Sequence, residues 1–296
     1  MRSDIIRAMT HDGSARLIFA QTTDIVQTAH KLHNTSKTMT AALGRCLTAA
    51  SLIGSLLKDA DNSLTLQVKG DGPAGSIMCV SDYCGNVKGY AEHPEAELLP
   101  NAQNKLDVGG VIGAGVMYVI KDMGLAEPYI GMTPLVSGEI AEDITEYFAA
   151  SEQIPTICAL GVRCDTDNNC IAAGGFLLQL LPNADETIIP KIEANIGKLD
   201  SVSSLLAKGT DVLEIISDIF TGIEYDLFDR IDIDYVCDCN RDRYYRALIS
   251  LGKDELQEIF DDNEPIETKC RFCNKSYIFN NDEIGEMIKN VGREDI

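Results

Sequence analysis

The stretch VCDC, residues 236–239, places Cys237 and Cys239 one residue apart in an acidic, largely polar part of the chain. A second close pair, Cys270 and Cys273, follows in CRFC. Neither pair has an apolar neighbourhood in which its thiols would be buried, so core packing does not explain them. Two close pairs separated by a spacer are typical of structural zinc sites, in which four thiolates complete a tetrahedron around the ion. The sequence therefore predicts one Zn²⁺ per chain, bound by these four cysteines.

The segment around these cysteines, residues 232–296, is predicted to be a small domain that the metal stabilises. Asn240 can cap a helix that ends near Gly252, a second helix follows, and CRFC leads into alternating Tyr277 and Phe279, as in a turn between two strands. Such a domain has only a very small apolar core. Structural zinc contributes apparent binding free energies of about 10–16 kcal/mol, whereas whole domains are stable by only about 5–15 kcal/mol. Loss of the metal is therefore expected to unfold this domain.

The predicted zinc site has no open coordination position, because thiolates fill all four, and a hydrolytic metal site is therefore disfavoured. Nearby basic residues are expected to offset the negative charge of the thiolates: Arg241, Arg243, Lys269, Arg271 and Lys275. Oxidation of thiolates is reversible at the disulfide stage. The residues alone leave three alternatives open, which are a purely structural zinc site, a resettable redox switch and, without metal, four reduced thiols.

Length and composition indicate a soluble globular protein. The chain has 296 residues, of which 45% are hydrophobic and 24% charged, so two folded units plus a connector are expected. A net charge of −21 disfavours binding to nucleic acid or anionic membranes. Charges in the N-terminal MRSDIIRAMTHDGS interrupt any signal-like apolar run, and no later stretch approaches about 18 uninterrupted apolar residues. We therefore expect a cytoplasmic protein whose cysteines form no static disulfide framework.

Residues 1–180 are predicted to form one α+β domain around a largely antiparallel sheet. Helical periodicity covers residues 21–58, with a break near HNTS, and GEIAEDITEYFAASEQ is also predicted to be helical. Alternating apolar residues and glycine turns mark the strand candidates: ARLIFA, LTLQV, SIMCV, VKGYA, VMYVI, TPLVSGE and a hairpin of TICALGVRC with IAAGGFLLQLLP. GDGPAG matches a dinucleotide-binding pattern, but a strand follows it, so we predict a turn.

Residues 181–231 are predicted to be a helical linker. After Pro182 and Asn183 come two or three amphipathic helices, the last of them following Gly209, with Thr210 as its cap. Helices this short cannot bury all their apolar stripes against one another, so they need a neighbouring surface. The linker is therefore expected to be stable only while that surface is available.

The remaining cysteines and the histidines suggest no further site. Three cysteines lie on apolar stripes and are expected to be buried: Cys46, Cys79 and Cys158. Cys84 is expected in a turn. Cys164 and Cys170 flank DTDNN and could face each other across the hairpin, which permits an extra disulfide or an accessory metal site, although reduced thiols are the favoured interpretation. No histidine shows a spacing typical of metal ligation: His11, His30, His33 and His93.

Long segments of the chain resemble one known family. VCDC and CRFC, with RALISLGKDEL between them, are similar to the zinc module of the heat shock protein 33 family of bacterial chaperones. The similarity continues in order through the preceding sequence: QVKGDGPAGSIM, KLDVGG, IKDMGLAEPYIGMTPLVSGEIAEDITEYFAASEQIP and GGFLLQLLP. The resemblance thus spans nearly the whole chain, and the long segments make it far more specific than the cysteine pairs alone.

The resemblance implies a redox-regulated holdase, which is not an enzyme and which binds unfolding client proteins without ATP under oxidative and heat stress. In this family the reduced protein holds zinc and is inactive, and the active form is a homodimer. Oxidants convert the pairs Cys237 with Cys239 and Cys270 with Cys273 to disulfides, and zinc leaves. The linker and the zinc module then lose structure, which would expose the apolar stripes of the linker.

Two other functions compete with this interpretation. A thiol-disulfide oxidoreductase would use CRFC as its redox pair, but that motif should begin a helix in a thioredoxin-like pattern, and here it leads into a strand. A zinc-ribbon nucleic-acid-binding protein would need a basic surface. The acidic charge of the chain opposes this, although six residues near the cysteines could form a small patch: Arg241, Arg243, Arg246, Lys269, Arg271 and Lys275.

Overall fold

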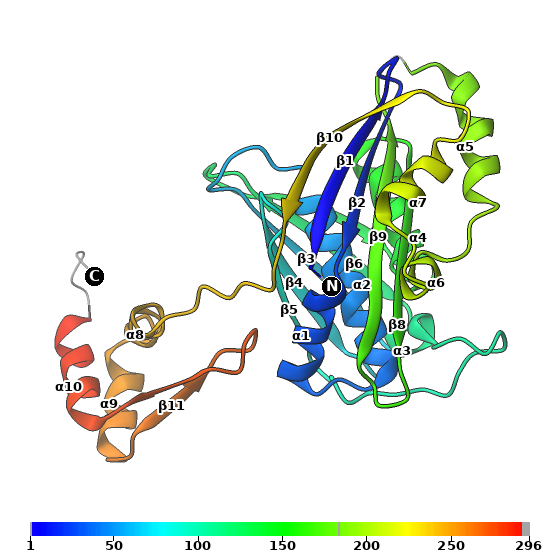
Figure 1. Cartoon of the computed structure of the whole chain (residues 1–296). Coiled ribbons are helices and arrows are strands. Elements are labelled where there is room, and N and C mark those ends of the chain that lie inside the picture. The colour runs from blue at the N-terminus through cyan, green and yellow to red at the C-terminus, as the bar shows by residue number, and fades with distance from the viewer. Residues whose placement is uncertain (1, 183, 292–296) are drawn as a thin grey trace. The chain divides into compact units, whose positions relative to one another are not determined.

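The computed structural model describes residues 2–182 and 184–291 (Figure 1). The chain divides into two compact units, Met1–Val236 and Cys237–Ile296. The boundaries expected from the sequence at residues 180 and 231 stay predictions. Asn183 and the last five residues of the predicted zinc domain, 292–296, lie outside the described residues. The fold is mixed, with sheets and helices in both units, as predicted.

The first unit contains two five-stranded antiparallel sheets, where the sequence predicted one largely antiparallel sheet. The first sheet has the order β10-β1-β2-β9-β8. Its strands are β1 (Asp4–Thr10), β2 (Ala15–Gln21), β8 (Thr156–Cys164), β9 (Cys170–Leu180) and β10 (Tyr225–Asp232). The second has the order β5-β4-β3-β6-β7. Its strands are β3 (Ser63–Gly70), β4 (Ser76–Asp82), β5 (Val87–Ala91), β6 (Gly115–Asp122) and β7 (Tyr129–Pro134).

Helix α2 (Lys37–Gly54) is the centre of the first unit. It is buried along almost its whole length and contacts strands of both sheets. Its apolar residues, including Leu43 and Leu47, share one core with Leu66 of β3 and Leu177 of β9. The two helices predicted in residues 21–58 are confirmed as α1 (Thr23–His33) and α2, which begins after its cap Ser36. Two shorter helices follow later in the chain, α3 (Val108–Ile112) and α4 (Ala141–Tyr147), and α4 continues as a π-helical turn over Phe148–Glu152.

The predicted linker helices pack on the opposite face of the first sheet. After a 3₁₀ turn (Glu186–Ile188) come α5 (Ile189–Ile196), α6 (Val202–Ala207) and α7 (Val212–Ile219). Their buried apolar residues form one cluster with residues of β2 and β9: Ile192, Leu206, Ile216, Leu17, Phe19 and Phe176. The expectation that these helices need a neighbouring surface is confirmed. The predicted N-terminal cap of α7, Thr210, is wrong. Asp211 is the cap, and its carboxylate accepts the N–H of Leu213.

Two strand predictions differ from the structure. No strand was predicted at β10, because most of its side chains point into solvent, including Phe228, and the apolar alternation of a half-buried strand is missing. Backbone pairing with β1 and the ion pair of Arg7 with Asp229 at 2.6 Å hold it. The strand predicted at TPLVSGE is wrong beyond Pro134, where β7 ends. The chain from there to α4 is a loop that the carboxylate of Asp143 fixes by binding its N–H groups.

The second unit has a small core of its own. A hairpin of β11 (Ile266–Lys269) and β12 (Ser276–Phe279) lies with three helices, α8 (Arg241–Ile249), α9 (Lys253–Asp261) and α10 (Asn281–Asn290). Asn240 caps α8 as predicted, accepting the N–H of Arg243. The buried apolar side chains of this core are few: Leu248, Leu256, Tyr277, Phe279, Ile284 and Met287. The expectation of a very small apolar core is confirmed.

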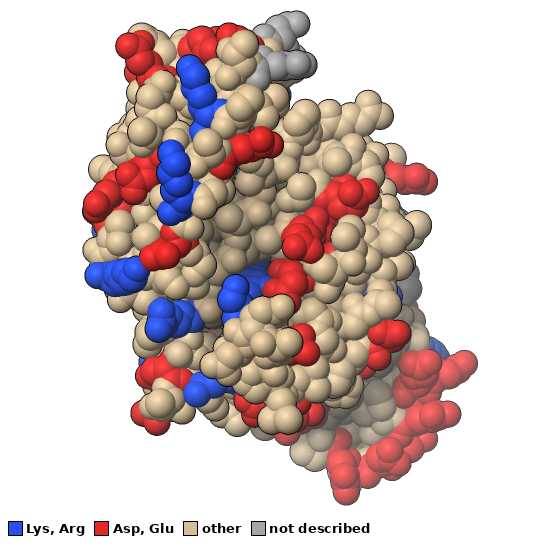
Figure 2. All heavy atoms as spheres, turned by 90° about the vertical axis from the view of Figure 1, so that its right-hand side faces the viewer, with Lys and Arg blue, Asp and Glu red and all other residues tan. Residues whose placement is uncertain are grey.

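Within residues 2–182 and 184–291 no helix is long and apolar enough to cross a membrane. On the face drawn in Figure 2, acidic side chains lie between the lysine and arginine side chains. That face therefore offers no continuous basic surface of the kind that a phosphate backbone requires.

The packing of α7 on the first sheet can be tested by replacing two side chains of equal size on this helix, one buried and one exposed, with alanine. Ile216→Ala removes fully buried methyl groups and should lower the free energy of unfolding of the first unit by about 2–4 kcal/mol. Leu213→Ala changes a side chain that is 40% exposed and should alter stability by about 0.5 kcal/mol or less. Urea unfolding followed by circular dichroism measures both, and equal losses would contradict the packing described here.

Candidate metal centre

The four predicted cysteines lie on two short segments of the second unit. Cys237 and Cys239 precede the N-terminal cap of α8, and Cys270 and Cys273 lie in the turn between β11 and β12. This turn is tight because the N–H of Asn274 donates to the carbonyl of Cys270 at 2.8 Å and that of Cys270 donates to the carbonyl of Lys275 at 2.9 Å. Asn274 has a φ of 61°, which asparagine tolerates better than most residues. The predicted strand–turn–strand arrangement of CRFC is confirmed.

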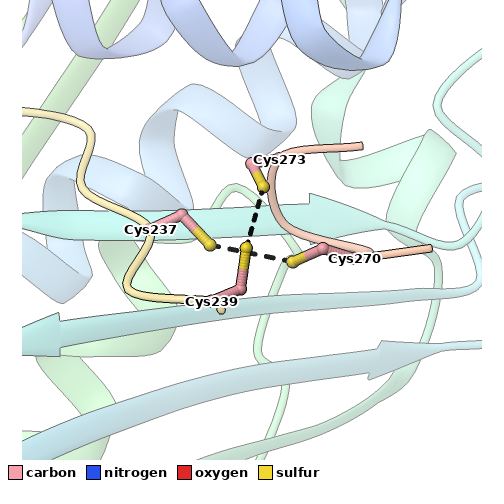
Figure 3. Close-up of side chains that lie close together, drawn as sticks. All are labelled: Cys237, Cys239, Cys270 and Cys273. Atoms are coloured by element: carbon pink, nitrogen blue, oxygen red, sulfur yellow. Dashed lines mark hydrogen bonds between the residues drawn. The ribbon is translucent and has the colours of Figure 1, made fainter. Parts of the chain in front are cut away.

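The four side chains point toward one common centre (Figure 3). All four sulfur atoms lie within 4.8 Å of one another. Two sulfur–sulfur contacts join the two segments, at 3.3 Å between Cys239 and Cys273 and 3.7 Å between Cys237 and Cys270. Thiolates bound to one zinc ion at Zn–S distances of about 2.3 Å lie about 3.8 Å apart in a tetrahedron. The donor set and its spacing therefore fit one tetrahedral thiolate-binding ion.

The surroundings of the cysteines affect the four thiols differently. Burial opposes ionisation of Cys270, but hydrogen bonds from the Tyr244 hydroxyl and from the N–H groups of Cys273 and Phe272 outweigh it and lower the pKa of that thiol to about 6. Burial is the main reason why the pKa of Cys237 is raised to about 12. Four thiolates held this close repel one another, and a divalent cation is the usual source of the compensating charge.

Two of the basic residues expected to offset the thiolates form ion pairs with carboxylates. Arg241 forms an ion pair with Glu283 at 2.7 Å and lies 4.2 Å over the ring of Phe279. Arg243 forms an ion pair with Asp238 at 3.1 Å. The expectation that these two residues also offset the charge of the thiolates stays a prediction.

Two tyrosines lie next to the cysteines, and neither of them was predicted to have a role at the metal centre. The hydroxyl of Tyr277 donates to the carbonyl of Cys239 at 2.9 Å and lies 3.2 Å from the sulfur of that residue. The ring of Tyr244 stacks on that of Tyr277, with 4.9 Å between the centroids. The sequence signal for these contacts was weak, because Tyr244 is on a helix and Tyr277 on a strand, and only the fold brings them to the same cluster.

The other cysteines and the histidines make no comparable cluster. Among the described residues, the four C-terminal cysteines are the only group of three or more His, Cys, Asp or Glu ligands close enough to hold an ion. Cys46 and Cys79 are buried, as predicted, whereas Cys158, also predicted to be buried, is only partly buried, and Cys84 lies in a turn. Cys164 and Cys170 do face each other across the β8–β9 hairpin. The accessory metal site considered for them lacks a third ligand within the described part of the chain.

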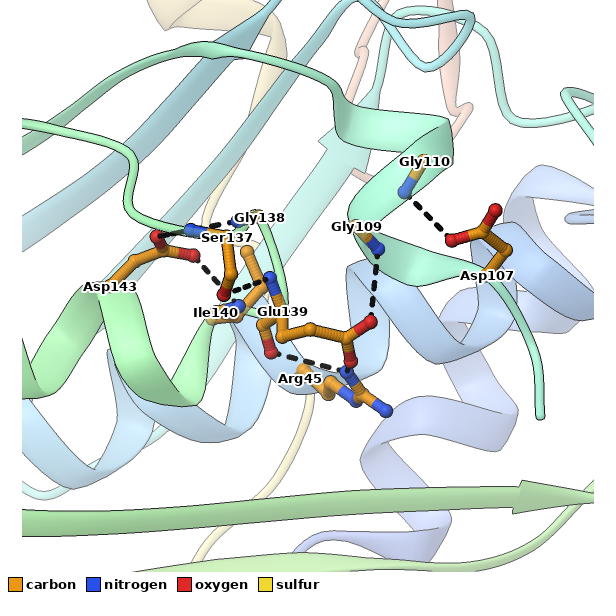
Figure 4. A network of polar contacts seen from close by, with 9 residues as sticks. All are labelled: Arg45, Asp107, Gly109, Gly110, Ser137, Gly138, Glu139, Ile140 and Asp143. Atoms are coloured by element: carbon orange, nitrogen blue, oxygen red, sulfur yellow. Dashed lines mark hydrogen bonds and ion pairs between the residues drawn. The ribbon is translucent and has the colours of Figure 1, made fainter. Parts of the chain in front are cut away.

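A cluster of polar contacts in the first unit holds the loop before α4 in place (Figure 4). Asp143 accepts the N–H groups of Val136 at 2.7 Å and of Ile140 at 2.9 Å, and Ile140 has a φ of 68°, a conformation that β-branched residues rarely adopt. Nearby, Arg45 forms an ion pair with Glu139, which also accepts the N–H of Gly109 at 3.2 Å. These carboxylates are thus occupied by donors of the protein and hold the loop before α4, and they do not form a ligand site.

Comparisons with known proteins agree over nearly the whole chain. The family model described as Hsp33 protein matches residues 3–280. A 33 kDa chaperonin of Lachnoclostridium phytofermentans is 45% identical over 288 residues, covering 97% of this chain and 99% of the relative. One of Clostridium botulinum is 43% identical over 295 residues, covering 99% and 100%. The crystal structure of a 33 kDa chaperonin from Thermotoga maritima matches with a TM-score of 0.90 and 35% identity, covering 98% of each chain. The chain therefore belongs to the Hsp33 family.

Proposed function

We propose that this chaperone is a redox-regulated, ATP-independent holdase, which binds unfolding proteins after its four C-terminal thiols are oxidised. The observation that carries the proposal is the gathering of four sulfur atoms within 4.8 Å in a unit with a very small apolar core. Membership of the Hsp33 family and the names of the relatives support a chaperone. The redox control, the metal and the independence of ATP are the parts that we add.

In the reduced protein, Cys237, Cys239, Cys270 and Cys273 would hold one Zn²⁺ as thiolates. When bound, the ion cross-links the segment before α8 to the β11–β12 turn and supplies positive charge to the four sulfurs. No fifth ligand or water is required, so the site is suited to holding structure. This assignment rests on the all-thiolate donor set, since thiolates favour zinc over hard cations.

Oxidation removes the ligands. Two thiols lose two electrons and two protons to hydrogen peroxide, which is reduced to two water molecules, and one disulfide forms. We propose the pairs Cys237 with Cys239 and Cys270 with Cys273, as the family resemblance implies. Two close sulfur contacts join the two segments, but all four sulfurs lie within 4.8 Å, so either pairing needs only small movements. A disulfide sulfur is no longer a thiolate ligand, and the cross-link between the segments is lost.

Loss of the cross-link should unfold the second unit and weaken the structure that precedes it. Tyr235 attaches the chain before Cys237 to β5, donating its hydroxyl to the carbonyl of Gly89 at 2.8 Å. The linker helices before β10 border a partly open pocket of about 310 Å³ between α5 and the first sheet, lined by Ile157, Leu178 and Ile192 among others. Their detachment would expose apolar residues of both surfaces to clients.

The competing functions have less support. CRFC lies in a turn between two strands and does not begin a helix, unlike the redox motif of thioredoxin-like enzymes. The nucleic-acid alternative needs a basic patch, and Arg241 and Arg243 are paired with carboxylates in a chain of net charge −21. We also propose a homodimer as the active form and the cytoplasm as its location, where thiols stay reduced until oxidative stress.

Replacement of one proposed ligand tests the metal centre. The reduced wild-type chain should bind about one zinc ion. Cys273→Ser should reduce zinc binding and unfold the second unit, because three thiolates leave the cross-link incomplete. Zinc quantification and hydrogen exchange over α8–α10 measure the two effects. Cys84→Ser, in a turn of the first unit, is the matched control and should change neither. A zinc-free reduced protein with a protected second unit would refute the proposed centre.

Peroxide treatment at elevated temperature tests the switch. Zinc should leave while suppression of aggregation of a thermally unfolding test protein appears, without ATP. Reduction with dithiothreitol and added zinc should reverse both. Release of zinc without any gain in holding activity would contradict the switch. Catalytic reduction of insulin would favour the oxidoreductase instead, and salt-dependent binding to generic RNA would favour the nucleic-acid alternative.

A further inference from the structure

A second pair of thiols lies in the first unit, at the end of the β8–β9 hairpin. Cys164 ends β8, Cys170 begins β9, and the two residues are partners in the antiparallel register. Directly opposed residues in such a pair have Cα atoms about 4.5–5.5 Å apart. Disulfides span Cα separations of about 4.4–6.8 Å. The backbone therefore already places the two cysteines at a distance that a disulfide can bridge.

A β-bulge directs both side chains to the same face. The register shifts between Arg163 and Cys164, so that Arg163 is opposite Ala172 and Ile171 has no partner. Cys170 consequently packs with Val26 and Ala173, beside Val162. Cys164 lies two residues after Val162 on the same strand, and residues two apart in a strand share a face. Without the bulge, Cys164 would be opposite Ile171.

Polar contacts fix the tip of the hairpin that joins the two cysteines. The carboxylate of Asp165 accepts the N–H of Asn169 at 2.9 Å, and the N–H of Asp165 donates to the carbonyl of Asn169 at 2.9 Å. Gln27 of α1 accepts the N–H of Cys170 at 2.6 Å and donates to the side chain of Asn169 at 3.0 Å. These hydrogen bonds fix the backbone on the β9 side of the turn and at its tip, so a disulfide would need mainly rotation about the side-chain bonds of the two cysteines.

The other cysteines of the first unit are less suited to pair. Cys46 and Cys79 are each 0% exposed in the main core, where an oxidant has no access. Cys158 is opposite Leu177, and Cys84 lies in a turn of the second sheet. Cys164 is partly exposed, at the end of a hairpin that extends toward solvent. It is therefore the accessible member of an opposed pair.

We propose that Cys164 and Cys170 form a disulfide under sustained oxidation, which closes the end of the β8–β9 hairpin. Hydrogen peroxide oxidises the thiol of Cys164 to a sulfenic acid and is reduced to water. The thiol of Cys170 then attacks that sulfur, the S–S bond forms, and a second water leaves, so two electrons and two protons pass to one peroxide. This modification site is separate from the proposed metal centre and does not depend on it.

Formation of this disulfide should be slow. Burial raises the pKa of Cys164 to about 11, even though the charge of Lys37 opposes the shift, and burial also raises the pKa of Cys170. Little thiolate is present at neutral pH, and the thiolate is the nucleophile. The disulfide would stabilise the hairpin, and β9 is the strand on which Phe176 supports the linker helices. The effect would be to preserve the first sheet during prolonged oxidative stress.

Peptide mapping of the full-length protein tests the disulfide. Trypsin releases residues 164–191 as one peptide that contains only these two cysteines, since it cleaves after Arg163 and after Lys191. After prolonged peroxide treatment and alkylation without reduction, the peptide should be two hydrogens lighter and carry no alkyl group. Cleavage before Asp165 or Asp167 should leave its two parts linked. Two alkylated cysteines after such treatment, or a link from either one to another cysteine, would overturn the proposal.

Thermal unfolding separates the disulfide from the rest of the oxidation chemistry. A disulfide that closes the short loop from Cys164 to Cys170 should raise the melting temperature of the oxidised first unit by about 5 °C. Cys164→Ser should abolish that rise, and Cys170→Ala provides a second variant in case the first perturbs the hairpin. Cys84→Ser should retain the rise. Zinc release and holding activity should be unchanged in all three variants, and an equal rise in Cys164→Ser would refute the role of this pair.

Discussion

The second unit depends on the closeness of four sulfur atoms. Its apolar core consists of a few side chains from three short helices and one hairpin, and such a core gives little net stability once chain entropy is subtracted. The segment before α8 and the β11–β12 turn approach each other at the cysteines, at 3.3 Å between the sulfurs of Cys239 and Cys273. A metal-mediated cross-link between these two segments would contribute more to the free energy of unfolding than this small core can. In the proposed function, the protonation and oxidation states of these four atoms would therefore decide whether the described part of the second unit, residues 237–291, stays folded.

The first unit is stable for a different reason. Helix α2 is surrounded by two sheets, and the first sheet is covered on its other face by α5–α7. Alternate residues of β2 divide between the two cores, with Ile18 and Ala20 facing α2, and Leu17 and Phe19 facing the linker helices. Only one of these cores depends on the linker helices. If the thiols act as proposed, their oxidation would loosen the layer of linker helices, and the central helix and its two sheets would remain.

The sequence predicted those parts in which local pattern and burial agree. Helices α1 and α2, the β8–β9 hairpin and the cap Asn240 all have strong local signals, and the cysteine spacing alone located the four-sulfur cluster. Strand β10 was missed because it is an exposed edge strand whose partner, β1, is more than 200 residues away. The environment of the cluster was also missed. Tyr244, rather than a basic side chain, lowers the pKa of Cys270, and this contact exists only in the folded unit.

The end of the first unit is a single run of chain that completes both sheets. Strand β10 pairs with β1 of the first sheet, and only three residues beyond it Tyr235 pairs in parallel with Val87 of the second. Detachment of residues 225–236 would thus strip two strands of hydrogen-bonding partners at once, one in each sheet. Rows of unsatisfied N–H and C=O groups readily accept an extended polypeptide as a new strand. Residues 225–236 therefore cover backbone N–H and C=O groups that another polypeptide could otherwise bind as an added strand. This backbone surface would be exposed in addition to the apolar surfaces nearby.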